Sequence, residues 1–321
     1  MKEKLGIIGS VLAAAIFFGV FYFFSGFWNF TKMGSCLKVS AQEQALVSSE
    51  EEMKILQLTD VQFESYLEQS AVFRSIKGVV KNTDPDLIVF TGDVLHNGGR
   101  AGHLDAFIDF MDKFQTPWAV VLGNHDYKAD VSVEEQCEKY EDSEYCIFRR
   151  GTLDDSYGNY YYNLIKDGRI AYSLIFMDSG LNGFTEAQVA WYEETLRAAE
   201  AENGGETVPS FAFYHIPTVE TAYAAALYEN DERIGTGRIG EDVNMQTTDS
   251  RFFDTLLELG STRAVFYGHD HVNDAILNYK GIQLCYGVKT GRTSYYDEAL
   301  QGGNLITVYA SGGFSVERIL I

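Results

Sequence analysis

Residues 263–271 read Arg-Ala-Val-Phe-Tyr-Gly-His-Asp-His, an apolar run that ends directly before two histidines. Such a run is typical of a buried β-strand, and imidazole is the commonest metal ligand among side chains. Two imidazoles two positions apart can face one point only if the backbone turns, and we expect Gly268 to permit that turn. Alone, the pattern also fits an ordinary polar turn. A metal site is indicated only if other potential ligands in the chain occur in the same context.

Four other apolar runs end in the same way, each at a potential metal ligand. They are residues 54–59 before Asp60, 87–92 before Asp93, 118–123 before Asn124 and His125, and 211–214 before His215. Continuous apolar strands separated by helix-like segments predict a mainly parallel sheet covered on both faces. Ligands of such sheets bind beyond the carboxyl ends of the strands. The repetition therefore predicts an α/β domain with one metal site at that edge.

The length and charge of the chain limit its function. The pattern spans most of the 321 residues, which favours one large domain. The formal charge of −21 argues against a nucleic-acid groove, because phosphate backbones need clustered Lys and Arg. A polyanionic substrate would be repelled by the chain as a whole but attracted locally to a pair of divalent cations.

The N-terminal segment differs from the rest in composition. No charged residue occurs between Leu5 and Thr31, and the apolar run exceeds the ~20 residues that span a bilayer. We interpret residues 1–31 as a transmembrane helix, 32–52 as an acidic stalk, and 53–321 as the folded domain. We expect the domain to be membrane-anchored and to lie outside the cytoplasm. The alternative is a secreted protein, cleaved near Ala41.

Local patterns predict the remaining elements. Apolar spacing and capping signals indicate helices at residues 66–81, 104–114, 185–199 and 251–259, strands at 160–165 and 170–177, and loops at 127–157 and 229–249. The tail, residues 281–321, predicts antiparallel strands at a sheet edge. Cys137 and Cys146 in the first loop either form a disulfide or are two unrelated thiols.

Five motifs, in chain order, resemble those of the calcineurin-like metallophosphoesterases, the superfamily that includes the purple acid phosphatases. They are Asp60-Val61-Gln62, Gly92-Asp93, Gly123-Asn124-His125-Asp126, His215 and Gly268-His269-Asp270-His271. The string Gly-His-Asp-His-Val-Asn-Asp at residues 268–274 is most similar to the purple-acid-phosphatase-like branch. The resemblance implies a four-layer β-sandwich flanked by helices, classed as α/β or, in some schemes, α+β.

The resemblance also implies a role for each motif residue. The first metal would be held by Asp60, Asp93 and His271, and the second by Asp93, Asn124, His215 and His269. His125 would be catalytic, because it would lie beside the phosphate and stabilise or protonate the leaving oxygen. The cofactors would be two divalent or mixed-valence ions of Mn, Fe or Zn, which suit oxygen and imidazole ligands. Such a pair generates a bridging hydroxide that attacks a phosphate ester.

One residue departs from the superfamily pattern. Most members have His where this chain has Gln62, whereas the purple acid phosphatases instead use a Tyr three residues after the bridging Asp. Here that position is His96. We therefore expect His96 to complete the shell of the first metal, and Gln62 to hydrogen-bond a bound water or phosphate. The alternative is that His96 is a solvated loop residue, and His103 is expected on the surface.

Two classes of function follow. The first is a phosphoric ester hydrolase that acts on a phosphorylated small molecule or lipid. The second is a non-catalytic binding or scaffold protein on the same fold, with a metal centre weakened at Gln62. The retention of His125 favours the enzyme, because a scaffold has no use for a proton donor at that position.

Overall fold

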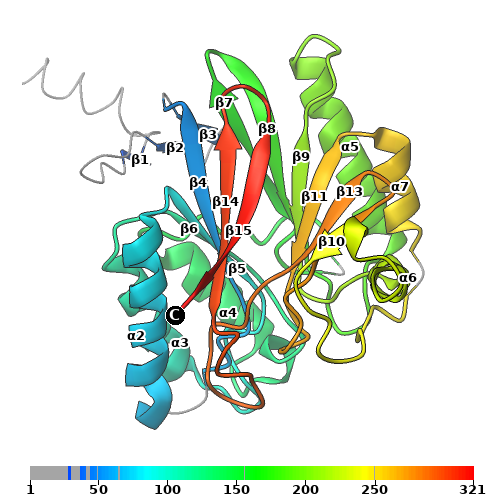
Figure 1. The fold of residues 1–321 in the computed structure, drawn as a ribbon. Helices are drawn as coiled ribbons and strands as arrows, with labels where there is room; N and C mark the ends of the chain where they lie inside the picture. The colour runs from blue at the N-terminus through cyan, green and yellow to red at the C-terminus, as the bar shows by residue number, and fades with distance from the viewer. Residues whose placement is uncertain are drawn as a thin grey trace, which may run out of the picture.

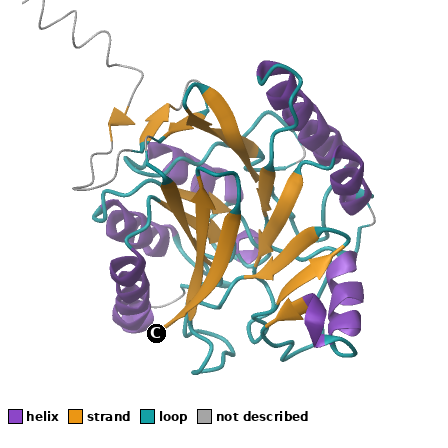
Figure 2. Cartoon of the chain, turned by 45° about the horizontal axis from the view of Figure 1, so that its top comes forward, coloured by secondary structure: helices purple, strands orange, loops and turns teal. Residues whose placement is uncertain are grey.

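A computed structural model of the chain describes residues 28–29, 37–40, 44–48, 50–63, 66–154, 156–248 and 250–321. Within these ranges two β-sheets lie side by side in the middle of the molecule, and helices cover their outer faces (Figure 1). The view in Figure 2 shows the same arrangement, with strands between two groups of helices. The predicted α/β sandwich is therefore confirmed. The single parallel sheet inferred from apolar runs alone is wrong, because the runs are divided between the two sheets.

The smaller sheet carries the first three of the predicted strand ends. Its order is β15-β14-β4-β5-β6, and β4, β5 and β6 are parallel. The strands are β4 (Glu52–Leu58), β5 (Leu87–Thr91), β6 (Trp118–Val121), β14 (Gly302–Tyr309) and β15 (Phe314–Leu320). The last two are antiparallel, as predicted for the tail, but only β15 lies at the edge, since β14 pairs with β4. For the first strand of the tail, residues 282–286, the prediction is wrong, because this strand lies inside the other sheet and is parallel to residues 262–267.

The larger sheet carries the other two strand ends. Its order is β1-β2-β3-β7-β8-β9-β11-β13-β12-β10, with β8, β9, β11 and β13 parallel in the middle. The strands are β1 (Trp28–Asn29), β2 (Lys38–Ser40), β3 (Ala45–Val47), β7 (Tyr160–Lys166), β8 (Arg169–Phe176), β9 (Ser210–Phe213), β10 (Gly235–Thr236), β11 (Thr262–Tyr267), β12 (Ile276–Tyr279) and β13 (Ile282–Tyr286). Residues 38–40 and 45–47 fall within the expected stalk, so part of that segment belongs to the sheet.

The helices close the two outer faces (Figure 1). One group lies beside the smaller sheet and consists of α2 (Tyr66–Thr83), α3 (Ala101–Asp112) and α4 (Val133–Asp142). The other lies beside the larger sheet and consists of α5 (Glu186–Glu202), α6 (Val219–Tyr228) and α7 (Phe252–Leu259). Two short 3-10 helices, η1 (Asp126–Lys128) and η2 (Glu232–Ile234), lie in the loops. Helix α5 begins with a capping box formed by Thr185 and Gln188, at the start of the helix predicted for residues 185–199.

Two local expectations need correction, and a third question that the sequence left open is answered. The acidic stretch 127–157 is not a plain loop, because α4 begins after the N-cap Ser132 and buries Cys137. Cys137 and Cys146 are free thiols, so of the two interpretations the unpaired one holds. His103 is 6% exposed rather than on the surface, and its ring lies 5.3 Å from that of Phe63.

Alternation along the strands of the larger sheet fills two cores. On β11, Ala264 and Phe266 join the core that lies between the sheets, whereas Val265 and Tyr267 pack in a second core with residues of α5, α6 and α7. Successive side chains of a strand point to opposite faces, which explains why the run is apolar throughout. Stacked rings of Phe176, Phe213 and Phe266, 5.2 and 5.1 Å apart, cross neighbouring strands on the inner face.

The predicted transmembrane helix, residues 1–31, lies outside the described residues except for β1. Among the helices of the described ranges, none combines the length and apolar character that crossing a bilayer requires.

Candidate metal centre

The predicted ligands converge from both sheets at the carboxyl ends of their strands. Asp60, Asp93 and Asn124 follow β4, β5 and β6, and His215 and His269 follow β9 and β11. Parallel strands within each sheet bring these ends to one edge. Residues more than two hundred positions apart therefore lie within hydrogen-bonding distance, as for the amide of His269 and Oδ2 of Asp60, 3.0 Å apart.

The first half of the centre consists of Asp60, Asp93 and His271. One ligand atom from each lies within 4.8 Å of the others, and all three side chains are buried. His271 Nε2 lies 3.3 Å from Oδ1 of Asp60. Its other ring nitrogen, Nδ1, is 2.9 Å from the backbone oxygen of Tyr295, to which it donates. Donation from Nδ1 leaves the Nε2 lone pair facing the carboxylates, as in a histidine that binds metal.

The second half is built around His215. Its Nδ1 donates to the backbone oxygen of Thr91 at 2.8 Å, so Nε2 faces inward. Nε2 then lies 3.3 Å from Asp93 Oδ2, 3.1 Å from Asn124 Oδ1 and 3.3 Å from His269 Nδ1. Asp93 is thus shared by both halves, which is the arrangement expected of a bridging ligand.

The backbone at the site adopts unusual conformations. Asp60, Gln62, Asp93 and His269 have φ of 52°, 49°, 53° and 78°. This left-handed region is disfavoured for residues with a Cβ atom. The turn expected at Gly268 is made by His269 instead. Gly268 is required for a different reason, since a Cβ there would lie 1.9 Å from Oγ1 of Thr59 and 2.4 Å from Oδ2 of Asp60.

His125 lies beside the ligands with one ring nitrogen facing them. Its Nδ1 is 2.9 Å from Oδ1 of Asn97, and an amide oxygen can only accept, so Nδ1 carries the hydrogen. Nε2 is 3.8 Å from Oδ2 of Asp93. The ring of His96 stacks on that of His125 at 4.7 Å. Among the described residues, the group with metal-ligand spacing does not include His96, so its predicted role as a ligand stays a prediction.

Gln62 lies in the first half of the centre but turns its amide nitrogen toward the ligands. Nε2 is 3.3 Å from Oδ2 of Asp93 and 3.1 Å from Nε2 of His271. Its carbonyl oxygen accepts a 2.8 Å hydrogen bond from the ammonium group of Lys289, which also donates to the backbone oxygen of Asp60 at 3.1 Å. Gln62 and Lys289 are both buried.

The electrostatics of the metal-free centre follow from two buried carboxylates. Burial opposes ionisation of Asp93, but the charge and hydrogen bond of His215 outweigh it and lower the pKa of Asp93. Burial likewise opposes ionisation of Asp60, but contacts with His271 and the charge of His215 lower its pKa. Burial also disfavours the charged imidazole of His215, yet Asp93 and Asp60 raise its pKa to about 10. A proton on His215 therefore partly balances the carboxylates when no cation is present.

Neighbouring groups respond to the same charges. Burial, together with the charge of His215, lowers the pKa of His269 to about 4, so His269 is neutral and able to bind metal at neutral pH. Burial lowers the pKa of Lys289 to about 8. Burial and the charge of Asp93 raise the pKa of Asp126 to about 7, while its carboxylate accepts the backbone amides of Leu95 and Gly123.

These residues fit a metal centre. Oδ1 of Asp60 is buried and accepts no hydrogen bond from the described residues, although a buried carboxylate oxygen normally has a partner. Two imidazoles present their Nε2 atoms beside it and beside Asp93. Carboxylate, amide oxygen and imidazole ligands together suit Mn, Fe or Zn. The centre therefore has the ligand types and the proximity needed to hold cations.

The sequence analysis missed several residues of the site. Lys289 and Tyr295 come from the tail, where no motif marks them; the Tyr295 ring stacks on His271 at 4.3 Å. The loop expected beside the site is there, since Glu241 accepts the amide of Val272 and the hydroxyl of Tyr295. A signal for Lys289 did exist: in the sequence it is a charged residue that follows directly after an apolar strand, as the ligands do.

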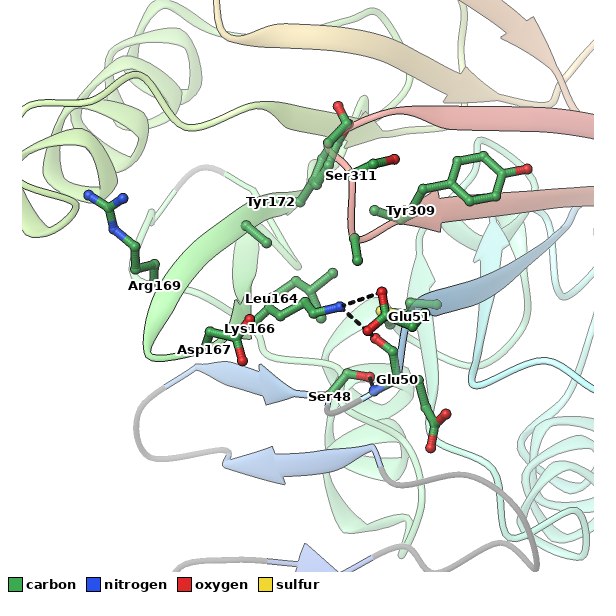
Figure 3. A pocket seen from close by; sticks show the side chains of 15 residues that line it. Ser48, Glu50, Glu51, Leu164, Lys166, Asp167, Arg169, Tyr172, Tyr309 and Ser311 are labelled. Carbon is green, nitrogen blue, oxygen red and sulfur yellow. Dashed lines mark hydrogen bonds and ion pairs between the residues drawn. The ribbon is translucent and has the colours of Figure 1, made fainter.

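A cavity elsewhere on the molecule has a different chemistry. It has a volume of about 620 Å³ and lies where β4 begins and where the β7–β8 and β14–β15 strands turn, at the other end of β4 from Asp60. Figure 3 shows Lys166 pointing toward Glu51 within it; the two charges are 3.6 Å apart. This lysine pairs with a neighbouring acid, and the described residues that line the cavity include no cluster of metal ligands. The candidate site is therefore the centre at the opposite end.

Comparisons with known proteins agree with this geometry. The chain is 26% identical over 272 residues to "Probable inactive purple acid phosphatase 28" of Arabidopsis thaliana, covering 74% of this chain and 66% of that protein. It is 27% identical over 242 residues to "Phosphatase DCR2" of Saccharomyces cerevisiae, covering 66% of this chain and 41% of that protein. The match thus spans no more than about two thirds of either relative.

A solved structure supports the fold. A dimetal phosphatase from Danio rerio superposes with a TM-score of 0.54 at 15% identity, covering 84% of this chain and 97% of the other. The sequence pattern of the family described as calcineurin-like phosphoesterase matches residues 53–273. With its five motifs gathered into one site, the chain belongs to the calcineurin-like phosphoesterase family.

Proposed function

We propose that this protein is a metal-dependent phosphoric ester hydrolase with two metal ions in the centre described above. The observation that carries the proposal is the shared position of Asp93, which lies within reach of both halves, together with His125 beside it. A purely structural cluster of buried carboxylates has no need of a half-buried imidazole at its edge.

Each residue of the centre would have a separate role in binding metal or in proton transfer. Asp60, Asp93 and His271 would hold one ion, and Asp93, Asn124, His215 and His269 the other. When bound, the ions neutralise phosphate charge and lower the pKa of a water molecule. His125 presents Nε2 toward the same space, while Asn97 fixes its orientation from the other side of the ring. A protonated Nε2 would supply the proton that a departing alkoxide needs.

The test is hydrolysis by protein stripped of metal and then loaded with Mn²⁺ or Zn²⁺. An aryl phosphate monoester and an aryl phosphate diester are compared, because the family alone does not decide between them. We expect His125→Ala to lower kcat by about 10²–10⁴-fold, the range of general acid catalysis. Arg169→Ala, at the exposed rim of the other cavity, is the control and should leave kcat unchanged. Hydrolysis that is equally fast in wild type and His125→Ala would refute the proposal.

The second candidate is a binding or scaffold protein with the same fold. Gln62 favours it, because its amide nitrogen faces Asp93 where most of the superfamily has a ligand. The plant relative carries "inactive" in its name, whereas the yeast relative is named a phosphatase. Metal uptake without hydrolysis of either ester, in protein that remains folded, would favour this candidate.

We further propose that the N-terminal segment tethers the domain to a membrane, outside the cytoplasm, with a phosphorylated small molecule or lipid as substrate. The support is the uncharged run between Leu5 and Thr31. Fractionation of cells that express the full chain, with and without alkaline carbonate extraction, tests the tether. Release of the intact chain into the soluble fraction would refute it.

A further inference from the structure

The orientation of the Gln62 amide is fixed by its partners. Lys289 offers only donors, so the atom of Gln62 that faces it must be the carbonyl oxygen, at 2.8 Å. The Asp93 carboxylate offers only acceptors, so the atom that faces it must be the amide nitrogen, at 3.3 Å. Turning the amide over would place oxygen against oxygen and nitrogen against ammonium. The carbonyl oxygen of Gln62 is therefore directed away from the ligands.

The amide nitrogen occupies the place that a cation needs. Nδ1 of His271 donates to the backbone of Tyr295, so Nε2 is the atom with which His271 would bind a metal, and Gln62 Nε2 lies 3.1 Å from it. The two hydrogens of the amide thus face Nε2 of His271 and Oδ2 of Asp93. These two atoms belong to two of the three ligands of the first half, and each would offer a lone pair to the cation. Since a lone pair that accepts a hydrogen bond is not available to a metal ion, the amide and the ion compete.

Lys289 holds the amide in this place. Its side chain is 1% exposed, reaches Gln62 from the β13–β14 connection and is braced by the backbone oxygen of Asp60. The backbone of Gln62 is held as well, because its carbonyl accepts the hydroxyl of Thr293 at 2.6 Å. In the second half, by contrast, the oxygen of Asn124 faces Nε2 of His215, so an oxygen ligand is presented there.

We propose that Gln62, oriented by Lys289, competes with the cation of the first half, so that the two halves of the centre bind metal with different affinities. The inference rests on the two-metal centre proposed above. Lys289 is then a positioning residue, and Gln62 is a competitor of the metal and not a ligand. The second half is expected to fill first, because no amide competes there and the proton of His215, which the charge of Asp93 stabilises against burial, is lost once a cation neutralises Asp93. The first half is expected to fill only at higher concentrations of free metal.

The test is a titration of metal-free protein with Mn²⁺ at pH 7, in which calorimetry measures the heat of binding. The metal content per chain after equilibrium dialysis gives a second, independent measure of binding. Wild type should show two events, of which Asp60→Asn removes the weaker, because Asp60 belongs to the first half alone. Gln62→Ala removes the competitor, and Lys289→Met releases it. Each should tighten the weaker event by about tenfold, the equivalent of one or two hydrogen bonds. A Gln62 that acted as a ligand would give the opposite sign, a loss of affinity.

The controls separate this effect from damage to the fold. Lys289→Arg keeps a cationic donor and should leave the weaker event within about threefold of wild type. Thermal unfolding of the metal-free variants reports whether each has folded; if Lys289→Met has not, Lys289→Gln takes its place with the same expected sign. The inference would be overturned if Gln62→Ala bound the weaker ion no more tightly than wild type, or if wild type bound both ions with equal affinity. Neither result would contradict the proposed hydrolase function. Failure to bind any metal would instead remove the proposed function.

Discussion

The interaction between Asn97 and His125 gives the sharpest prediction about catalysis. Asn97 is exposed and touches the proposed acid only through the 2.9 Å contact of its Oδ1 with Nδ1. Replacing it with Ala leaves every proposed metal ligand in place. The imidazole then loses the partner that keeps a hydrogen on Nδ1 and Nε2 directed toward Asp93, 3.8 Å away.

The size of the effect follows from that single contact. A hydrogen bond of this kind contributes about 0.5–1.5 kcal/mol, which corresponds to about a 2- to 13-fold loss in rate if it acts fully in the transition state. An exposed substitution changes the free energy of unfolding by about 0.5 kcal/mol or less. We therefore expect Asn97→Ala to lower kcat severalfold with an almost unchanged Tm.

The assay is kcat for two monoesters, one with an alkyl and one with a nitrophenyl leaving group, in the single variants and the double variant. The alkyl ester should suffer more, because a poor leaving group needs the proton. In the His125→Ala background, Asn97→Ala should have no further effect, since both changes remove the same function. Asn97→Asp keeps an acceptor and should restore most of the rate. Equal losses from Asn97→Ala with and without His125 would refute the reasoning.

Three further predictions concern metal and thiols. Chelation should lower Tm by about 5 °C relative to protein with metal at 100 times Kd, as ~2.7 kcal/mol of binding energy is lost; an identical Tm in a fluorimetric melt would contradict this. Gly123→Ala should reduce the metal content per chain, because its Cβ would lie 2.2 Å from Oδ1 of Asp93, whereas Gly78→Ala meets nothing closer than 3.9 Å and should not. The buried Cys137, whose pKa burial raises to about 12, should react with a thiol reagent only after unfolding, and a reductant should leave Tm unchanged.

The sequence was a good guide to the site because of one physical regularity. Parallel strands place their carboxyl ends at a common edge, so a ligand after each apolar run predicts a shared location. That argument does not depend on which sheet a strand joins. It therefore could not predict that β4, β5 and β6 belong to one sheet and β9 and β11 to another. The runs are equally apolar in both sheets, because each strand is covered on both faces.

Details set by tertiary contact could not be predicted. The acidic composition of α4 hides a narrow buried face that includes Gln136 and Tyr140, so local polarity indicated a loop. Lys289 follows an apolar strand, as the ligands do, but only its own pairing with Thr59, which the sequence does not reveal, brings it under the centre. His269 takes the left-handed backbone that was expected of Gly268, because Gly268 is needed for close approach to Thr59.

The strained backbone explains why the centre depends on the whole sandwich. Left-handed conformations cost about 1–2 kcal/mol for residues with a Cβ atom, and Asp60, Gln62 and Asp93 each adopt one. They are held by hydrogen bonds between the two loops, from the amide of Asp60 to Gly92 and from that of Gln62 to Asp93. Since both loops emerge from paired strands, the energy that sustains the strain comes from burial of those strands, and not from the ligands. The carboxylates are therefore in place before any cation arrives, and a metal ion has only to displace a proton from His215 and the amide of Gln62.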